Sequence, residues 1–313
     1  MACKLESISD PGFEPTPQKE KRQSVSHYDI LMIGHITSDL LNFKGDVTPF
    51  TGGATYFASY AAKKTGVRFC VLTKLAEKDF GAVEEMRKDG IEVVALPSPQ
   101  TTSIENIFET DDLDKRKVRL ISQADPFFPR DLPDVPVKTY YLGGLFVGEI
   151  PHALIEYLAK KGNVALDMQA MLRTSEDGKS FFRDWAEKEK YLPRVTYLKA
   201  DSLESEVATG TTDREKAARM FYQWGAKEIV ITHASEVIVY DGKRIYRAPF
   251  NPKNLSGRTG RGDTCFGSYT GWRLHHGIEE SVRFAAALTS IKMEKRGPFR
   301  GTLEDVFARM KGL

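Results

Sequence analysis

The sequence of 313 residues has few cysteines, no long apolar run and almost no net charge. Its cysteines, Cys3, Cys70 and Cys265, are odd in number and far apart, so they offer neither a disulfide framework nor a closely spaced metal pair. No apolar run reaches the roughly 18–20 residues of a membrane-spanning helix. The 45 basic and 43 acidic residues give a net charge of +2, without the basic excess of dedicated nucleic-acid-binding proteins. We therefore expect a cytoplasmic protein with no membrane or nucleic-acid partner.

The N-terminal segment 1–26 differs in composition from the rest of the chain. It contains Pro11, Pro15 and Pro17 and a charged cluster at 19–22. It also lacks the apolar core of a signal peptide. We expect residues 1–26 to form a poorly ordered tail that does not direct secretion.

From residue 28 onward, short apolar runs alternate with stretches whose apolar residues recur at helical spacing. Such runs are typical of parallel strands buried on both faces, and the stretches between them predict helices. The pattern indicates an α/β domain whose mostly parallel sheet is covered by helices on both faces. The main strands are expected at 30–33, 69–72, 140–142, 164–167, 195–198 and 229–232.

Two regions interrupt this rhythm. The runs at 91–96, 104–108 and 118–121 follow one another without intervening helices, which predicts a small antiparallel sheet inserted in the main domain. We place this inserted sheet in segments of about 41–51 and 91–122.

The sharpest local motif is a glycine-rich turn at 257–264. Gly257, Gly260 and Gly262 lie within six residues, two arginines are interspersed, and Asp263 then opens a predicted helix. Glycines let the backbone approach a ligand closely, and the free N–H groups of a helix N-terminus attract anions such as a phosphoryl group. Asp263 could then accept a proton from an attacking hydroxyl group. Taken alone, however, Asp263 fits a helix cap better, because Asp is common at that position.

This turn resembles the second signature of the ribokinase (PfkB) family of carbohydrate and nucleoside kinases, Asp-Thr-x-Gly-Ala-Gly-Asp. Gly260, Gly262 and Asp263 match its last part. The resemblance implies that Asp263 is the catalytic base and that the preceding amides form an anion hole. Gly257 stands in place of the first Asp, a departure that affects the monovalent-cation site of some members. Arg261 replaces the small central residue and adds a candidate phosphate contact.

Two further motifs resemble the acceptor-binding elements of the same family. Gly34 and, five residues later, Asp39 resemble the first-strand pair whose Asp binds substrate hydroxyl groups. Gly52 and Gly53 resemble the glycine pair that lets substrate approach the backbone. Phe57 stands where the family often has Asn, so this version is similar to members that act on cyclitols such as myo-inositol or on unusual sugars. Without the family context, a solvated turn explains these residues equally well.

The motifs that would bind the phosphoryl donor match the family more loosely. Asp201 and Glu204 resemble the Asn-x-x-Glu motif, which implies that Glu204 helps to hold Mg²⁺, through water because Mg²⁺ dehydrates reluctantly. Two acids at a helix start also suit the helix dipole. Thr232 and Ser235 resemble the segment that contacts nucleotide phosphates, with Ala234 in place of Gly. Three residues after a central strand could face the substrate: Asp167, Gln169 and Arg173.

The resemblance extends over residues 28–313 and implies one kinase domain at 27–313 with a ribokinase-like three-layer α/β fold, the inserted sheet being a lid over the substrate. The implied reaction is ATP- and Mg²⁺-dependent phosphoryl transfer to a hydroxyl group of a sugar or cyclitol. A nucleoside kinase of the same family and an inactive nucleotide- or sugar-binding regulator are the alternatives. The tripeptide at 261–263 also matches a short adhesion motif, a weak signal. Lids of this family sometimes pair, which leaves a homodimer open.

Overall fold

The computed structural model describes residues 27–110 and 116–313, and the tail predicted for residues 1–26 lies outside this part. Its larger sheet has nine strands. In spatial order these are β15 (Ile245–Pro249), β14 (Glu236–Tyr240), β13 (Glu228–Thr232), β12 (Tyr197–Asp201), β9 (Asn163–Asp167), β8 (Val137–Leu142), β1 (Tyr28–Ile33), β4 (Phe69–Leu75) and β5 (Val93–Pro97). From β13 to β5 every neighbouring pair is parallel, which confirms the predicted mostly parallel sheet.

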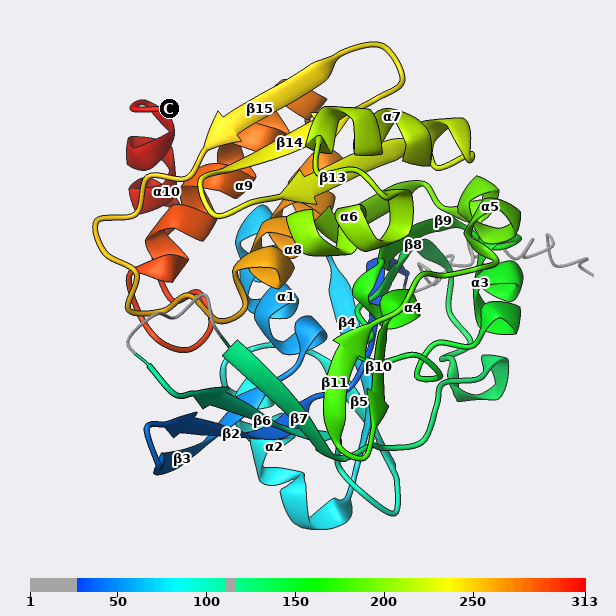
Figure 1. Cartoon of the computed structure of the whole chain (residues 1–313), viewed down its shortest axis with the longest axis vertical. Helices are drawn as coiled ribbons and strands as arrows, with labels where there is room; N and C mark the ends of the chain where they lie inside the picture. The colour runs from blue at the N-terminus through cyan, green and yellow to red at the C-terminus, as the bar shows by residue number, and fades with distance from the viewer. Residues whose placement is uncertain (1–26, 111–115) are drawn as a thin grey trace, which may run out of the picture.

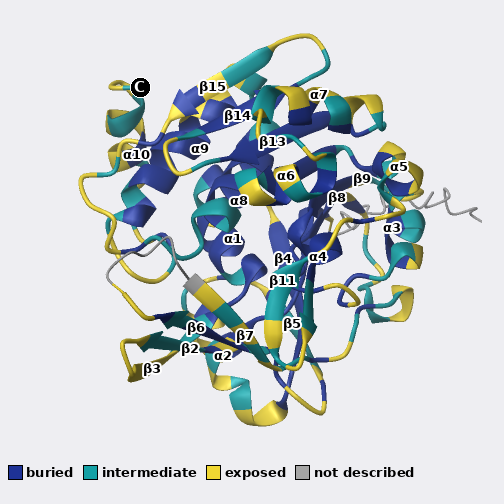
Figure 2. Cartoon of the chain, viewed as in Figure 1, coloured by how far each residue is buried: buried dark blue, intermediate teal, exposed yellow. Residues whose placement is uncertain are grey.

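Helices cover both faces of this sheet (Figure 1). Within β1, Ile30 and Met32 pack into one core and Leu31 and Ile33 into the other, as the alternation of side chains along a strand requires. Figure 2 shows that the strands between the two helical layers are buried. The first core is covered by α1 (Ala54–Ala62), α2 (Gly81–Lys88), α8 (Arg261–Arg273) and α9 (Ile278–Met293), with α10 (Leu303–Met310) packed on α9. The second is covered by α3 (His152–Ala159), α5 (Lys188–Tyr191), α6 (Ser202–Thr209) and α7 (Arg214–Gln223), and the short α4 (Gln169–Leu172) follows β9.

The strand β5 lies elsewhere than the sequence pattern suggests. Residues 91–96 are expected in the small inserted sheet, but β5 pairs in parallel with β4 at the edge of the large sheet. The reason is the helix α2 between them, because a parallel neighbour requires a crossover connection and a helix is the usual one. Val83 and Met86 of α2 are buried on the sheet.

The second sheet has six strands and lies at the lower end of the molecule in Figure 1. Its order is β10 (Arg173–Glu176), β11 (Lys179–Phe182), β7 (Arg116–Ser122), β6 (Ser103–Phe108), β2 (Thr37–Phe43) and β3 (Asp46–Gly52). Three of these strands, β3, β6 and β7, fall almost entirely within the predicted inserted segments, and β2 begins before them and only its end lies inside. The hairpin of β10 and β11 is an addition that the predictions lack, although its turn, Asp177 and Gly178 at φ of 50° and 78°, is a typical hairpin signal.

No helix in the described ranges is long and apolar enough to cross a membrane.

Candidate active site

The carboxyl ends of three neighbouring parallel strands meet at a buried ion cluster. Asp167 ends β9, Lys199 pairs with it in register on β12, and Thr232 ends β13. The Lys199 ammonium lies 3.0 Å from both carboxylate oxygens of Asp167 and 3.4 Å from Oε2 of Glu204. All four side chains are buried. Open α/β sheets bind ligands at this edge, so the cluster marks the candidate site.

The charges of this cluster depend on one another. Burial raises the pKa of Asp167 to about 6, although Lys199 opposes the shift. Burial and the neighbouring Asp201 raise the pKa of Glu204 to about 8. Burial alone would lower the pKa of Lys199, but the carboxylates of Asp167 and Glu204 more than compensate and raise it. Lys199 is therefore a permanent positive charge below the site.

The glycine turn lies directly above this lysine. Gly260 is the N-cap of α8 with φ of 79°, a conformation that favours glycine. A Cβ at Gly262 would lie 3.3 Å from the Lys199 Nζ and 3.8 Å from Oγ1 of Thr232. That Thr232 oxygen is buried and has no hydrogen-bond partner among the described residues. Amides, an ammonium and an unsatisfied hydroxyl group thus converge where an anion would be held.

Asp263 occupies the first turn of α8 and does not cap it. The N-cap is Gly260, and no side chain makes a capping hydrogen bond there, so the cap interpretation of Asp263 is wrong. Within the described residues, its half-buried carboxylate accepts no hydrogen bond. It is close enough to Lys199, Asp167 and Lys292 to influence their ionisation. A carboxylate that is held near a cationic cluster but unused by the fold is available to take a proton.

The small sheet contributes a second carboxylate. Asp39 of β2 is 3% exposed and accepts a hydrogen bond of 3.1 Å from the Ile104 amide through Oδ1. Its Oδ2 would lie 2.3 Å from a Cβ at Gly52. Gly53 follows with φ of 106°, and a Cβ there would meet the His35 carbonyl oxygen at 2.2 Å. The structure therefore brings Asp39, Gly52 and Gly53 together: a side chain at Gly52 would collide with the Asp39 carboxylate, and one at Gly53 with the backbone of His35.

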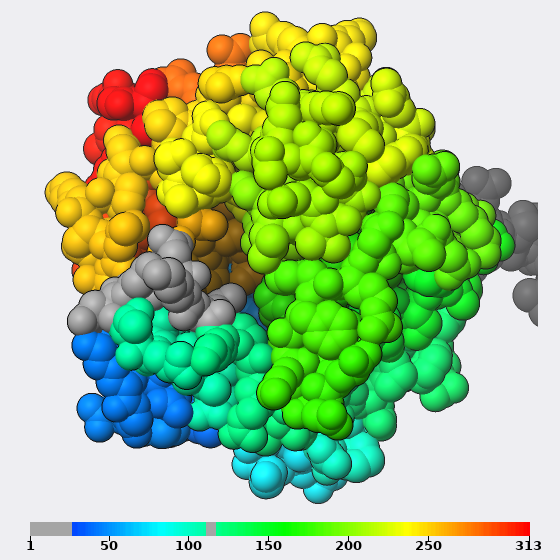
Figure 3. Space-filling view, viewed as in Figure 1, coloured from blue at the N-terminus to red at the C-terminus, as the bar shows by residue number. Residues whose placement is uncertain are grey.

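Helix α1 connects this part of the small sheet to the glycine turn. It begins directly after Gly53, and Phe57, one turn further on, donates its amide to the Gly53 carbonyl at 3.3 Å. The Phe57 ring is buried under the turn, since a Cβ at Gly260 would lie 2.3 Å from it. One helical turn rises about 5.4 Å, so Gly53 beside the small sheet and the ring under Gly260 are joined by a single turn of α1. Figure 3 shows a hollow in this face of the molecule between the small sheet and the helical part.

Asp201 and Glu204 form the capping box of α6. The Asp201 carboxylate accepts the Glu204 amide at 2.8 Å, and Glu204 Oε2 accepts the Asp201 amide at 2.7 Å. Their role at the helix start is therefore established by geometry. In the described part of the chain, no group of three or more His, Cys, Asp or Glu side chains could hold a metal ion. A metal at Glu204 would need water or phosphate oxygens as its other ligands.

Three predicted residues remain: Gln169, Arg173 and Ser235. The backbone amide of Gln169 donates a hydrogen bond of 3.1 Å to Asp167 Oδ1. The Arg173 guanidinium lies over the rings of Phe146 and Phe182, at 5.8 and 5.3 Å from their centroids. Ser235 is exposed, and its hydroxyl group is 2.9 Å from Nδ1 of His233.

The sequence predictions missed two residues of this region. Lys199 is one of them. The other is Asn106 on β6, which is 3% exposed and whose Oδ1 has no partner among the described residues. The pairing of Leu40 with Glu105 and of Leu41 with Asn106 places Asn106 on the same face of the small sheet as Asp39. An unsatisfied amide oxygen on that face is a candidate contact for a hydroxyl group of the acceptor.

Substitution of Asp39 by Asn is expected to raise KM for the acceptor by roughly 10–100-fold with a smaller effect on kcat, because a charge-assisted hydrogen bond contributes about 1.5–3 kcal/mol. Steady-state kinetics at varied acceptor concentration measure KM and kcat separately. Asp46→Asn, at an exposed position of the same sheet, is the matched control. An unchanged KM in Asp39→Asn would exclude Asp39 from acceptor binding.

Comparisons with known proteins agree with this geometry. The family model described as pfkB family carbohydrate kinase matches residues 26–304. A solved pyrophosphate-dependent kinase in the ribokinase family, complexed with a pyrophosphate analog and myo-inositol, is 39% identical, with a TM-score of 0.83 over 89% of this chain and 99% of that one. The cytidine kinase of Thermococcus kodakarensis is 25% identical over 88% of this chain and 99% of its own length. The inositol 3-kinase of Oryza sativa subsp. japonica is 28% identical over 76% of this chain and 61% of its own length.

Proposed function

Because the chain belongs to the pfkB family of carbohydrate kinases, we propose that it transfers a phosphoryl group to a hydroxyl group of a cyclitol of the myo-inositol type. The observation that carries this proposal is the Asp263 carboxylate, which accepts no hydrogen bond from the residues that the structure describes and lies near the Lys199 ammonium and the amides of the glycine turn. The cyclitol is supported by the myo-inositol complex of the 39%-identical relative and by the inositol 3-kinase match.

In the proposed reaction, Asp263 accepts the proton of the acceptor hydroxyl group as its oxygen attacks the terminal phosphorus of the donor. The new O–P bond forms while the bond from that phosphorus to the bridging oxygen breaks, and the bridging oxygen leaves with the rest of the donor. Negative charge on the transferring group is stabilised by the amides of 260–262 and by Lys199, which lies under Gly262. Positioning and electrostatic stabilisation supply most of the rate enhancement of such reactions.

The residues near the donor side fit a magnesium ion held mainly by water and phosphate. Asp201 raises the pKa of Glu204 in addition to burial, so a cation would relieve the repulsion between these two carboxylates. Oxygen ligands from one or two carboxylates plus phosphate are usual for Mg²⁺. When bound, the ion would neutralise charge on the donor phosphates. Glu204 would orient it, with Asp201 and Thr232 beside it.

The resemblance implies ATP as the phosphoryl donor, but we propose pyrophosphate instead. The 39%-identical structure is described as pyrophosphate-dependent. Pyrophosphate presents only phosphate oxygens, so its binding must rely on amides and cations. In this chain Arg261 occupies the central position of the turn, and Lys199 and Lys292 lie around it. Ser235 and Thr232 would contact the donor phosphate further from the acceptor.

A donor-by-acceptor panel tests the proposal. We expect pyrophosphate with myo-inositol and Mg²⁺ to give a phosphorylated cyclitol, detected by ³¹P NMR. The kcat/KM with pyrophosphate should be at least about 100-fold above that with ATP, the size of effect produced when one hydrogen bond to the transferring group is lost. Removing Mg²⁺ with EDTA is expected to stop the reaction. Failure of every donor and acceptor would contradict phosphoryl transfer, and a preference for ATP would contradict the donor assignment alone.

The second candidate is a nucleoside kinase. It is favoured by the cytidine kinase match, which extends over 99% of that protein. Cytidine with ATP is therefore part of the panel. The Phe57 ring, which could have stacked on a base, is buried under Gly260 with 4% exposed, so the observed packing favours the cyclitol.

A further inference from the structure

Lys292, near the end of α9, has an unusual environment. Its side chain is 3% exposed, and its ammonium donates a hydrogen bond of 2.5 Å to the Gly257 carbonyl oxygen and another to the carbonyl oxygen of Thr259. Both acceptors belong to the turn that leads to Asp263. The ammonium also lies 5.1 Å from the centroid of the Phe57 ring, the ring that supports Gly260 from below.

No carboxylate within ion-pair distance balances this ammonium among the residues that the structure describes. Burial lowers the pKa of Lys292 to about 8, and the charge of Asp263 opposes that shift. Lys is rarely buried unless it is paired. Within the described ranges, the direct partners of this cation are thus backbone carbonyl oxygens of the turn and the face of an aromatic ring, groups that also hold monovalent cations.

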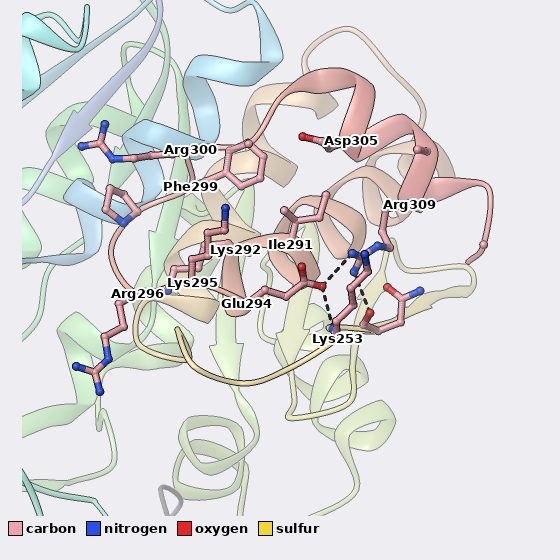
Figure 4. A pocket seen from close by; sticks show the side chains of 15 residues that line it. Lys253, Ile291, Lys292, Glu294, Lys295, Arg296, Phe299, Arg300, Asp305 and Arg309 are labelled. Atoms are coloured by element: carbon pink, nitrogen blue, oxygen red, sulfur yellow. Dashed lines mark hydrogen bonds and ion pairs between the residues drawn. The ribbon is translucent and has the colours of Figure 1, made fainter.

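The turn depends on this end of α9 in further ways. The Gly257 amide donates to the Met293 carbonyl at 2.8 Å, and a Cβ at Gly257 would lie 1.7 Å from the Lys295 carbonyl oxygen. Lys292 therefore completes a contact that fixes the turn on α9. Figure 4 shows Lys292 beside Ile291 and Lys295 among the residues that line a cavity of about 550 Å³ between the end of α9 and α10.

We propose that Lys292 is a positioning residue that acts as a built-in monovalent cation: its ammonium holds the 257–260 turn in the shape that aims the amides of 260–262 and the Asp263 carboxylate at the reacting groups. This inference rests on the proposed function for its effect on rate. Its effect on the turn itself is independent of that function.

The kinetic test uses Lys292→Met and Lys292→Ala. We expect kcat to fall about 100-fold in both, with KM for the acceptor changed less than about threefold, because small misplacements of reacting groups cost rate on this scale. Ammonium or potassium chloride is expected to restore Lys292→Ala at least tenfold and to leave the wild type unchanged. Lys295→Met, an exposed lysine of the same cavity, is the matched control with wild-type kcat.

A second measurement keeps the inference separate from the reaction. Amide hydrogen exchange at 257–263 is expected to be at least tenfold faster in Lys292→Ala than in the wild type, and to slow again with ammonium or potassium but not with tetramethylammonium chloride at equal ionic strength. If the wild type transfers no phosphoryl group, this exchange result still decides the role of Lys292. Unchanged exchange in Lys292→Ala, or equal restoration by tetramethylammonium, would overturn it. If Lys292→Ala does not fold, Lys292→Gln replaces it in the same measurements.

Discussion

Asp263→Asn is expected to lower kcat for phosphoryl transfer by roughly 10²–10⁴-fold, the usual contribution of a general base. The amide has the shape of the carboxylate but cannot accept the hydroxyl proton. Binding of the acceptor should change little, because Asp39 and the 52–53 glycines are left intact. Steady-state kinetics with pyrophosphate and with ATP measure kcat and KM separately.

The fold is expected to tolerate this substitution. Asp263 neither caps α8 nor accepts a hydrogen bond in the described structure, so thermal unfolding of Asp263→Asn should match the wild type within a few degrees, because no cap or hydrogen bond is lost. Asp134→Asn, at an exposed position, is the matched control. A folded Asp263→Asn variant with wild-type kcat would remove Asp263 from the role of base.

The parts that local pattern controls could be predicted from the sequence. The apolar runs at 30–33 and 69–72 become central strands because a strand buried on both faces must be apolar throughout. The Gly260–Asp263 turn was also predictable, since glycine spacing and a following helix are local features. The prediction for β5 was wrong, although its local signal was present: a helix at 81–88 between two strands favours a parallel neighbour in the same sheet.

The charged framework of the site could not be predicted in the same way. Lys292 lies on an ordinary helix, and only the tertiary contact of α9 with the turn brings its ammonium to the Gly257 and Thr259 carbonyls. Lys199 gave one signal: it stands between the buried residues Leu198 and Ala200 of an apolar strand, and a charge there must be paired. Its partner, Asp167, is 32 residues away, and the register of β9 and β12 decides the pair.

The Lys199–Asp167 pair is the basis of the second prediction, a large loss of stability. In Lys199→Met the free energy of unfolding is expected to fall by about 3–5 kcal/mol at pH 8, because removal of one partner leaves buried charge uncompensated. Chemical denaturation in EDTA-containing buffer at pH 8 and pH 5 measures it. Lys295→Met, an exposed lysine, should stay within about 0.5 kcal/mol of the wild type.

The loss of unfolding free energy in Lys199→Met is expected to be larger at pH 8 than at pH 5. In the wild type, burial raises the pKa of Asp167 to about 6 and that of Glu204 to about 8, above the values near 4 of unfolded chains. The folded state therefore binds more protons between about pH 4 and pH 8, and these two groups make the protein more stable as the pH falls through that window. Without Lys199 both pKa values rise further, so the destabilisation at pH 5 should be clearly smaller than at pH 8. An equal loss at both values would contradict the ion cluster as its cause.

A double variant separates the stability of the cluster from its chemistry. Asp167→Asn combined with Lys199→Met removes the carboxylate together with its partner, and replacing both members of a buried pair is far less costly than breaking it. We expect this variant to recover a large part of the unfolding free energy at pH 8 but to remain at least about 100-fold below the wild-type kcat, because the positive charge under Gly262 is still missing. Recovery of both stability and kcat would show that Lys199 only neutralises Asp167 and takes no part in stabilising the transferring group.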